Sequence, residues 1–383
     1  MANFDFSLSS DIVLGIYSLA RIGERISAFS RQVMLITDPV LKPSGLIQKV
    51  QKALEEYDVS VFVFDDMVQN PNSDVIDRTL KLARGAKVDC IIGVGGMTIC
   101  SIARATASLY NEERSVYDFF EGQEPKAPPL PLCQVPTTCR DPFLCMKVSP
   151  ITDARNRNTK LLKLQDSLGS LIMFDPNVYS GIPKNSLTSM IFAGVSAAFE
   201  GYISTKSNFF SQTTLKRAIE LFLSTVNQQK QKMIGTSVEQ VLAEATCLTA
   251  LGLSSSSPGL GTALSIATSS RYDISSSLIA SILFPSVLSD AIKSNLDKVV
   301  DVARMLETEL VDESDLLAKA EAGVIEVRRQ LSVANLPMRL KDIELSIESL
   351  VPVAQDAASL SFISYLPRPL SSSGIFELIK EAY

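Results

Sequence analysis

The residues best placed for chemistry form a glycine turn, Gly93-Val94-Gly95-Gly96, directly after a short apolar run. A strand, a glycine turn and the start of a helix bring unpaired backbone N–H groups and the positive end of a helix dipole together, which creates an anion site. Glycine also lets a pyrophosphate approach the backbone closely. Gly95, Gly96 and Thr98 are therefore candidate cofactor contacts. Tight strand-to-helix turns need glycine for steric reasons as well, so the pattern alone leaves nucleotide binding open.

Two further groups could contact a nucleotide. Asp38 follows an apolar run at 31–37 and precedes a proline. An acidic residue at a strand end can accept a hydrogen bond from a ribose hydroxyl, or it can simply form the turn. Thr137 and Thr138 follow another apolar run, and their hydroxyls can reach a cofactor or cap the next turn. Both interpretations stay open for each group.

Histidine is absent from the whole chain. Imidazole is the commonest general acid–base group near neutral pH and the commonest transition-metal ligand, so neither option exists here. The six cysteines include no Cys-x-x-Cys pair, and in a chain of this size we expect them to be buried, reduced thiols.

Composition narrows the class of protein. With 383 residues, 46% of them hydrophobic, the chain can form two domains. The net charge of −6, the isoelectric point near 5.1 and the lack of a long basic run argue against nucleic-acid partners. We find no apolar stretch of membrane-spanning length and no signal sequence at the N-terminus. We therefore expect a cytoplasmic protein with no membrane partner.

The elements that must position these residues differ between the two halves. Strands expected at 31–37, 59–64, 132–135 and 170–174 alternate with helices at 46–57, 74–86 and 98–105, which predicts a parallel sheet. A hairpin is expected at 153–163. The second half predicts helices at 185–204, 212–227, 238–253, 275–291, 296–306, 314–331 and 343–358. The expected domains are residues 1–180, an α/β domain like those that bind dinucleotides, and residues 181–383, an all-helical domain.

Eight short motifs are spread along nearly the whole chain. They are Thr37-Asp38-Pro39, Asn70-Pro71-Asn72, Gly95-Gly96, Pro136-Thr137-Thr138, Ile151-Thr152-Asp153, Phe174-Asp175-Pro176, Glu200-Gly201-Tyr202 and Pro367-Arg368. In this order they resemble the motifs of iron-containing (group III) alcohol dehydrogenases. The resemblance implies the dehydroquinate synthase-like fold of that family, with an α/β dinucleotide-binding domain, an all-α C-terminal domain, an active-site cleft between them and, as the usual assembly, a homodimer.

The resemblance also implies a metal, held in the family by one Asp and three His, with a further His nearby. The four ligand positions fall on Ala193, Ala197, Leu264 and Ser276, and the accessory position falls on Thr268. Each is apolar or a hydroxyl. We therefore expect no metal.

The cofactor contacts of the family are altered as well. Met97 replaces the third glycine of the turn, and a bulky segment at 139–144 replaces a small Gly-Thr-Gly-Ser-Glu-like stretch. Drift in a dispensable loop would give the same changes. Because bulk enters at both contacts, we expect NAD and NADP to bind weakly or not at all, and we assign no cofactor.

The favoured hypothesis is a repurposed, metal-free, non-redox enzyme. It would cyclise or isomerise an apolar biosynthetic intermediate of secondary metabolism, for example by a pericyclic step. Its alternatives are a metal-independent NAD(P)H-dependent reductase resembling maleylacetate reductase, and a catalytically silent pseudoenzyme. The candidate catalytic residues are Tyr272, Arg140 and Ser276, and the candidate pocket residues are Ala193, Ala197, Leu264, Thr268, Met97, Phe143 and Val148.

Overall fold

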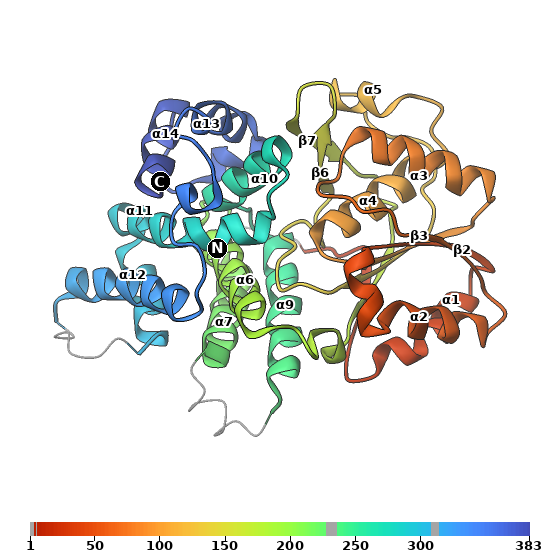
Figure 1. The fold of residues 1–383 in the computed structure, drawn as a ribbon, viewed down its shortest axis with the longest axis horizontal. Coiled ribbons are helices and arrows are strands. Elements are labelled where there is room, and N and C mark those ends of the chain that lie inside the picture. Colours follow the sequence, from red (N-terminus) through yellow and green to blue (C-terminus); the bar gives the residue numbers. More distant parts are fainter. Residues whose placement is uncertain (1–3, 5, 227–235, 308–313) are drawn as a thin grey trace. The chain divides into compact units, whose positions relative to one another are not determined.

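The chain divides into two compact units, Met1–Gly181 and Ile182–Tyr383. The computed structural model describes residues 4, 6–226, 236–307 and 314–383 (Figure 1). Each unit is described by itself below. The boundary expected from the sequence lies between residues 180 and 181.

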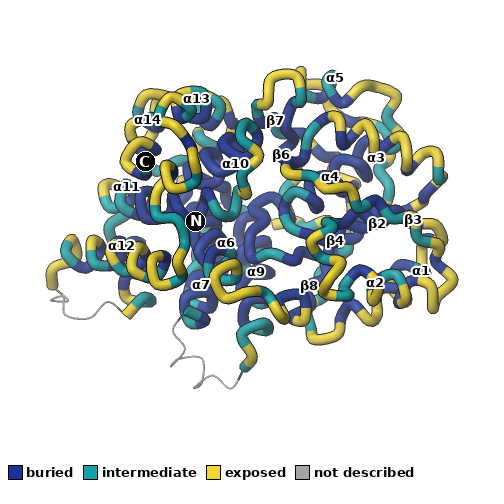
Figure 2. The backbone as a smooth tube through the Cα atoms, in the orientation of Figure 1, coloured by how far each residue is buried: buried dark blue, intermediate teal, exposed yellow. Residues whose placement is uncertain are grey.

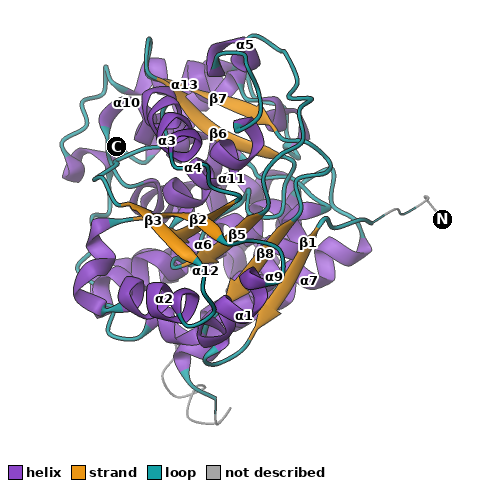
Figure 3. Cartoon of the chain, turned by 90° about the vertical axis from the view of Figure 1, so that its right-hand side faces the viewer, coloured by secondary structure: helices purple, strands orange, loops and turns teal. Residues whose placement is uncertain are grey.

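The first unit is built on a six-stranded sheet in which every neighbouring pair is parallel (Figure 3). The strand order is β1-β8-β5-β4-β2-β3. Strand β4 is buried along its whole length, as the apolar run in its sequence predicts for a parallel strand. The bounds are β1 Ser10–Leu14, β2 Gln32–Thr37, β3 Ser60–Phe64, β4 Cys90–Gly95, β5 Leu132–Pro136 and β8 Ser170–Phe174.

Helices and one hairpin complete this unit. In α4, every residue except Thr98 is buried, which makes it the central helix of the unit. The expected hairpin forms from two antiparallel strands, β6 Val148–Asp153 and β7 Asn158–Lys163. The helical elements are η1 Ser18–Arg21, α1 Ile22–Ser27, η2 Pro39–Ser44, α2 Leu46–Glu55, α3 Ser73–Gly85, α4 Met97–Leu109, α5 Val116–Phe120 and η3 Pro176–Tyr179.

The second unit is helical throughout its described residues. Helix α6 packs against α7, α9, α10 and α11, and Figure 2 shows buried backbone along it. The bounds are α6 Lys184–Ile203, α7 Phe209–Val226, α9 Val238–Ser254, α10 Leu260–Tyr272, α11 Ser276–Met305, α12 Leu316–Val333, η4 Leu340–Ile343, α13 Leu350–Ser359, η5 Ser361–Tyr365 and α14 Ser372–Glu381.

The structure of the helical unit differs from the sequence prediction at two helices, and at a third the comparison is limited to the described residues. Helix α10 was not predicted, because all its residues from Leu260 to Ser270 are buried and the apolar periodicity of an amphipathic helix is missing. The helices expected at 275–291 and 296–306 are one element, α11, with a non-helical backbone at Asn295. The expected end of the helix at 212–227 lies outside the described residues.

The expectation that no apolar stretch reaches membrane-spanning length was wrong. By length and composition α11 is long and apolar enough to cross a membrane. However, 61% of its apolar window is buried inside the protein, which is how the core helix of a globular unit behaves.

Candidate functional site

The glycine turn after β4 is shaped by packing of the chain on itself. A Cβ atom added to Gly93 would lie 2.7 Å from the Ala103 Cβ, and one added to Gly95 would lie 2.6 Å from the Ile99 Cβ. Both partners belong to α4, which follows the turn directly. These two glycines are therefore required for α4 to pack closely on β4, whether or not a ligand binds.

The space beside Gly96 is filled by the loop that follows β5. A Cβ atom at Gly96 would lie 3.0 Å from Cγ2 of Thr138. The backbone N–H of Thr137 donates to the Gly95 carbonyl oxygen at 3.0 Å, and the Thr138 hydroxyl donates to the Arg140 carbonyl oxygen at 3.3 Å. Met97, the first residue of α4, is also buried. Thr138 thus occupies the side of Gly96 on which a Cβ would stand, and Met97 adds a side chain where the resemblance expects a third glycine, so the residues after Gly96 fit a pyrophosphate less well than a triple glycine does.

Asp38 has a local role in the turn after β2. Its Oδ1 accepts from the backbone N–H of Val40 at 2.9 Å and caps η2, which begins at Pro39. Of the two interpretations left open by the sequence, this contact is the one expected of a turn-forming Asp before proline.

The loop after β5 is tied to α4 by a buried ion pair. Nη1 of Arg104 lies 2.8 Å from Oδ2 of Asp141, and both side chains are 2% exposed. The same guanidinium donates to Gln134 at 3.0 Å and Ser101 at 2.9 Å, and its Nε donates to Ser149 at 3.3 Å. All five N–H bonds of Arg104 therefore have an acceptor once the second, longer contact to Asp141 is included.

The bulky segment at 139–144 is held inside the protein by the same carboxylate. Oδ1 of Asp141 accepts from the backbone N–H of Phe143 at 3.0 Å, and the Phe143 side chain is fully buried. Arg140 is buried as well, whereas Val148, the first residue of β6, is half-buried. Arg140, Phe143, Val148 and Met97 all belong to the first unit.

The positions that the resemblance assigns to metal ligands lie on helices of the second unit. Ala193 and Ala197 stand one turn apart on α6, and Leu264 and Thr268 stand one turn apart on α10. These four side chains are at most 1% exposed. Ser276, the first residue of α11, is half-buried.

These residues do not fit a metal ion. The alanine and leucine side chains carry no donor atom, and Thr268 and Ser276 offer only neutral hydroxyls, which are poor ligands for a transition metal. Among the described residues, no group of three or more His, Cys, Asp or Glu side chains is placed to hold a metal. A transition-metal site needs such a set of nitrogen, sulfur or carboxylate ligands.

The candidate catalytic residue Tyr272 lies at the end of α10, where two contacts join this helix to the α13 region. Its hydroxyl donates to the Ser349 carbonyl oxygen at 3.1 Å. Neighbouring Arg271 donates two hydrogen bonds of 2.6 and 3.0 Å to Asp356, and hydrogen bonding to this carboxylate raises the pKa of Arg271. Both side chains therefore have structural partners in the helical unit.

Glu200 is the buried polar residue that the sequence reasoning missed. Its carboxylate accepts from the backbone N–H groups of Gly259 at 2.8 Å and Thr262 at 3.1 Å, and from the Ser196 hydroxyl at 3.2 Å. A Cβ atom at Gly261 would lie only 2.4 Å from Glu200 Oε1. Glu200 of α6 thus caps the N-terminus of α10, and we call this arrangement the Glu200 cap. Both of its motifs, Glu200-Gly201-Tyr202 and Gly259-Leu260-Gly261, are visible in the sequence, but nothing there indicates that they meet.

The cysteines are free thiols, as the sequence predicts, and all except Cys145 are buried. Burial raises the pKa of Cys133 to about 12 and that of Cys247 to about 11. Such thiols stay protonated at neutral pH and are poor nucleophiles and poor metal ligands.

Comparison with known proteins gives one consistent family. The sequence model described as iron-containing alcohol dehydrogenase matches residues 9–176, and the model for the C-terminal part of that family matches residues 191–383. The 1,3-propanediol dehydrogenase of Klebsiella pneumoniae is 21% identical over 384 aligned residues, which cover 99% of each chain.

Solved structures agree with this result. The crystal structure of a 1,3-propanediol oxidoreductase superimposes with a TM-score of 0.89 at 21% identity, covering 100% of both chains. That of sulfoacetaldehyde reductase from Bifidobacterium kashiwanohense, in complex with NAD+, gives a TM-score of 0.81 at 17% identity and covers 100% of this chain and 99% of that one. At these identities the likeness shows the fold: a parallel α/β unit followed by a helical unit.

Proposed function

The chain belongs to the iron-containing alcohol dehydrogenase family, and from this premise we propose that it is a metal-independent member that catalyses a non-redox reaction. The reaction is a ring closure or isomerisation of a largely apolar small molecule. The observation that carries the proposal is the nature of the four ligand positions: Ala193, Ala197 and Leu264 are buried and carry no donor atom, and Ser276 offers only a neutral hydroxyl.

The altered nucleotide turn supports the non-redox part of the proposal. Hydride transfer to or from a nicotinamide needs a bound dinucleotide, and a dinucleotide needs clearance at the glycine turn. Thr138 fills the space beside Gly96, and Met97 stands where the family has a third glycine. The loop with Phe143 is fixed by the Arg104–Asp141 pair rather than free to move aside.

A ring closure needs neither a metal nor a proton shuttle. Holding a flexible substrate in its reactive conformation can lower a barrier by several kcal/mol, and by roughly 7–11 kcal/mol in favourable cases. In this proposal the small and apolar positions on α6 and α10 shape the substrate. A hydroxyl from Tyr272 or Ser276, both in the helical unit, stabilises the charge that develops. A cytoplasmic location and a homodimer belong to the same proposal.

Mass spectrometry separates the proposed reaction from its alternatives. A cyclisation or isomerisation conserves the molecular formula, whereas a reduction adds two hydrogen atoms. We would incubate the protein with an extract of apolar metabolites, with and without NADPH, and follow which compounds disappear and which appear. The proposal expects a product of unchanged mass that forms without NADPH. A product that requires NADPH and is heavier by two hydrogens would favour the reductase, and no turnover at all would favour the silent protein.

A pair of matched variants tests where the reaction occurs. Ala197→Val adds two methyl groups at one proposed substrate position, and Ala245→Val makes the same change at a buried position of α9. Circular dichroism and thermal unfolding check that both variants fold. We expect Ala197→Val to slow turnover at least tenfold while Ala245→Val leaves it close to wild type. Equal effects of both variants would contradict the placement.

A further inference from the structure

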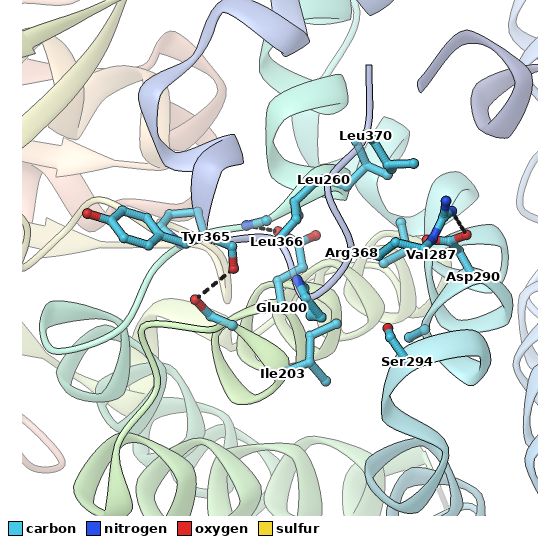
Figure 4. A pocket seen from close by; sticks show the side chains of 15 residues that line it. Glu200, Ile203, Leu260, Val287, Asp290, Ser294, Tyr365, Leu366, Arg368 and Leu370 are labelled. Atoms are coloured by element: carbon cyan, nitrogen blue, oxygen red, sulfur yellow. Dashed lines mark hydrogen bonds and ion pairs between the residues drawn. The ribbon is translucent and has the colours of Figure 1, made fainter. Parts of the chain in front are cut away.

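The helical unit contains a second candidate site, a pocket between α6, α10, α11 and the chain at 365–370 (Figure 4). We call it the α11 pocket. Its empty space is about 460 Å³ when the open mouth is counted, and its interior has room for about two water molecules. Its residues are Glu200, Ile203, Ser204, Pro258, Gly259, Leu260, Val287, Asp290, Ala291, Ser294, Tyr365, Leu366, Pro367, Arg368 and Leu370.

The α11 pocket is distinct from the positions of the vacated metal site. On α6 it includes Glu200 and Ile203, whereas Ala193 and Ala197 lie earlier in the same helix. On α10 it includes Leu260 at the start of the helix, whereas Leu264 and Thr268 lie one and two turns later. The inference below is therefore independent of the proposed function.

Most of the pocket wall is apolar, and the polar part does not suit an anion. The N–H groups at the start of α10, which would otherwise attract an anion, already donate to the Glu200 carboxylate. Asp290 places a second carboxylate in the wall. The wall thus holds two carboxylates and one guanidinium, and the guanidinium is already paired with Asp290, so a carboxylate ligand would meet net repulsion.

Arg368 supplies the polar atom that has no acceptor. Its Nη2 binds Oδ1 of Asp290 at 2.5 Å, and Figure 4 shows this ion pair on the α11 side of the pocket. Its Nε is buried and has no hydrogen-bond partner among the described residues. A buried N–H donor without an acceptor is unfavourable, and a ligand oxygen would satisfy it.

We propose that the α11 pocket binds a small neutral molecule with an apolar body and one carbonyl oxygen, such as a ketone, an ester or a lactone. The carbonyl oxygen accepts from the Arg368 Nε–H. The apolar body lies against Leu260, Val287 and Leu370. Because the enclosed interior is small, the carbonyl end lies inside and the apolar body extends into the open mouth of the pocket, so the affinity of this small ligand is modest.

Ligand-observed NMR with a matched set of probes tests this site. Cyclopentanone carries the carbonyl on an apolar ring, cyclopentane lacks the acceptor, and pentanoate replaces the carbonyl with a carboxylate. We expect saturable binding of cyclopentanone in the millimolar range or tighter and at least tenfold weaker binding of the other two. Equal binding of cyclopentane would overturn the role of the donor, and stronger binding of pentanoate would overturn the choice of a neutral ligand.

Two variants locate the binding. Arg368→Lys keeps a cation for Asp290 but removes the Nε–H, and it should weaken cyclopentanone binding about tenfold, the factor that corresponds to one hydrogen bond from a charged donor. Ala291→Leu fills the pocket from α11 and should abolish binding. Arg329→Lys, in an exposed pair with Glu326 on α12, is the control and should bind like wild type. Unchanged binding in both pocket variants would contradict the proposal.

Discussion

A single side chain, Glu200, supplies the negative charge at the start of helix α10. The start of a helix attracts negative charge, and in many proteins that charge is a ligand. At α10 the charge belongs to the protein itself, since Glu200 accepts from Gly259 and Thr262 while lying in a buried position. The cap joins α6 to α10, the two helices that carry four of the five positions assigned to the metal site and its accessory residue. It therefore maintains the geometry of this region without any metal.

Replacing the carboxylate should destabilise the helical unit. Glu200→Gln removes the negative charge from the start of α10. It also replaces one carboxylate oxygen by an NH₂ group, which cannot accept from the backbone N–H groups that it faces. We therefore expect a loss of about 2 kcal/mol in the free energy of unfolding. Chemical denaturation followed by circular dichroism measures this. Glu377→Gln is the control, because Glu377 and its partner Lys380 are exposed and should contribute less than about 0.5 kcal/mol. A loss at Glu200 as small as that at Glu377 would show that the cap has no structural importance.

Asp153 makes the stability of the α/β unit depend on pH. Hydrogen bonds from Arg155 lower the pKa of Asp153, and the Nη2–Oδ2 distance in this pair is 2.7 Å. A carboxyl whose pKa is lower in the folded than in the unfolded state stabilises the fold above the unfolded pKa of about 3.9, and it loses that contribution as the pH falls through the folded value.

Asp153→Asn should therefore be less stable than wild type at pH 7, by roughly 1 kcal/mol because Arg155 is half exposed. The difference should shrink below about pH 4. Urea unfolding of both proteins between pH 7 and pH 3 gives the comparison. A difference that stays constant across this range would show that the ionised carboxylate is not its source.

Helix α4 and the loop after β5 are joined by a buried ion pair and its hydrogen bonds. Arg104 on α4 binds Asp141 in the loop, and Asp141 in turn fixes the backbone of Phe143. Removing one member of a buried ion pair leaves an unpaired charge, so Asp141→Leu or Arg104→Met alone should cost about 3–5 kcal/mol. The double change Arg104→Met with Asp141→Leu removes both charges and should recover most of the loss.

Denaturant midpoints of the three variants complete that double-mutant cycle. Additive losses in the double variant would mean that the two residues act separately. A second readout is calorimetric titration with NAD and NADP: if the loop blocks the turn, the double variant should bind more tightly than wild type. Tight binding by wild type itself would contradict the steric account.

An element could be predicted from the sequence where its structure leaves a local residue pattern, and it was missed where no such pattern exists. Strands β2, β4, β5 and β8 were predicted because buried parallel strands are short apolar runs between turns, and the edge strand β3 was predicted from its β-branched and aromatic residues. The glycine turn was located correctly, but only the structure shows that Ala103 and Ile99 are the reason for Gly93 and Gly95. Helix α10 was missed because burial on all sides removes the amphipathic pattern. The Arg104–Asp141 pair and the Glu200 cap join residues far apart in the chain, and a single sequence does not reveal such pairings.

At the scale of the whole molecule, the fold of the family is kept in a chain without histidine. Both units have well-formed cores in their described residues, and α6 lies at the centre of the helical one. The fold is therefore stabilised by its own packing and by contacts such as the Glu200 cap. If the protein binds no metal, as we propose, its melting temperature should be the same in the presence of EDTA and of added Fe²⁺ or Zn²⁺. A melting temperature that rises by several degrees with either ion would indicate that the protein has a metal-binding site.

Elemental analysis of the purified protein tests most directly whether the chain binds a transition metal. The protein would be prepared without an affinity tag, dialysed against chelator and analysed by inductively coupled plasma mass spectrometry for iron, zinc, manganese, cobalt and nickel. Ala193, Ala197 and Leu264 carry no donor atom for a metal. We therefore predict far less than ~0.1 metal ion per chain, where ~0.1 is the level of adventitious binding at a site without ligands. Close to one transition-metal ion per chain, retained through dialysis, would contradict this prediction.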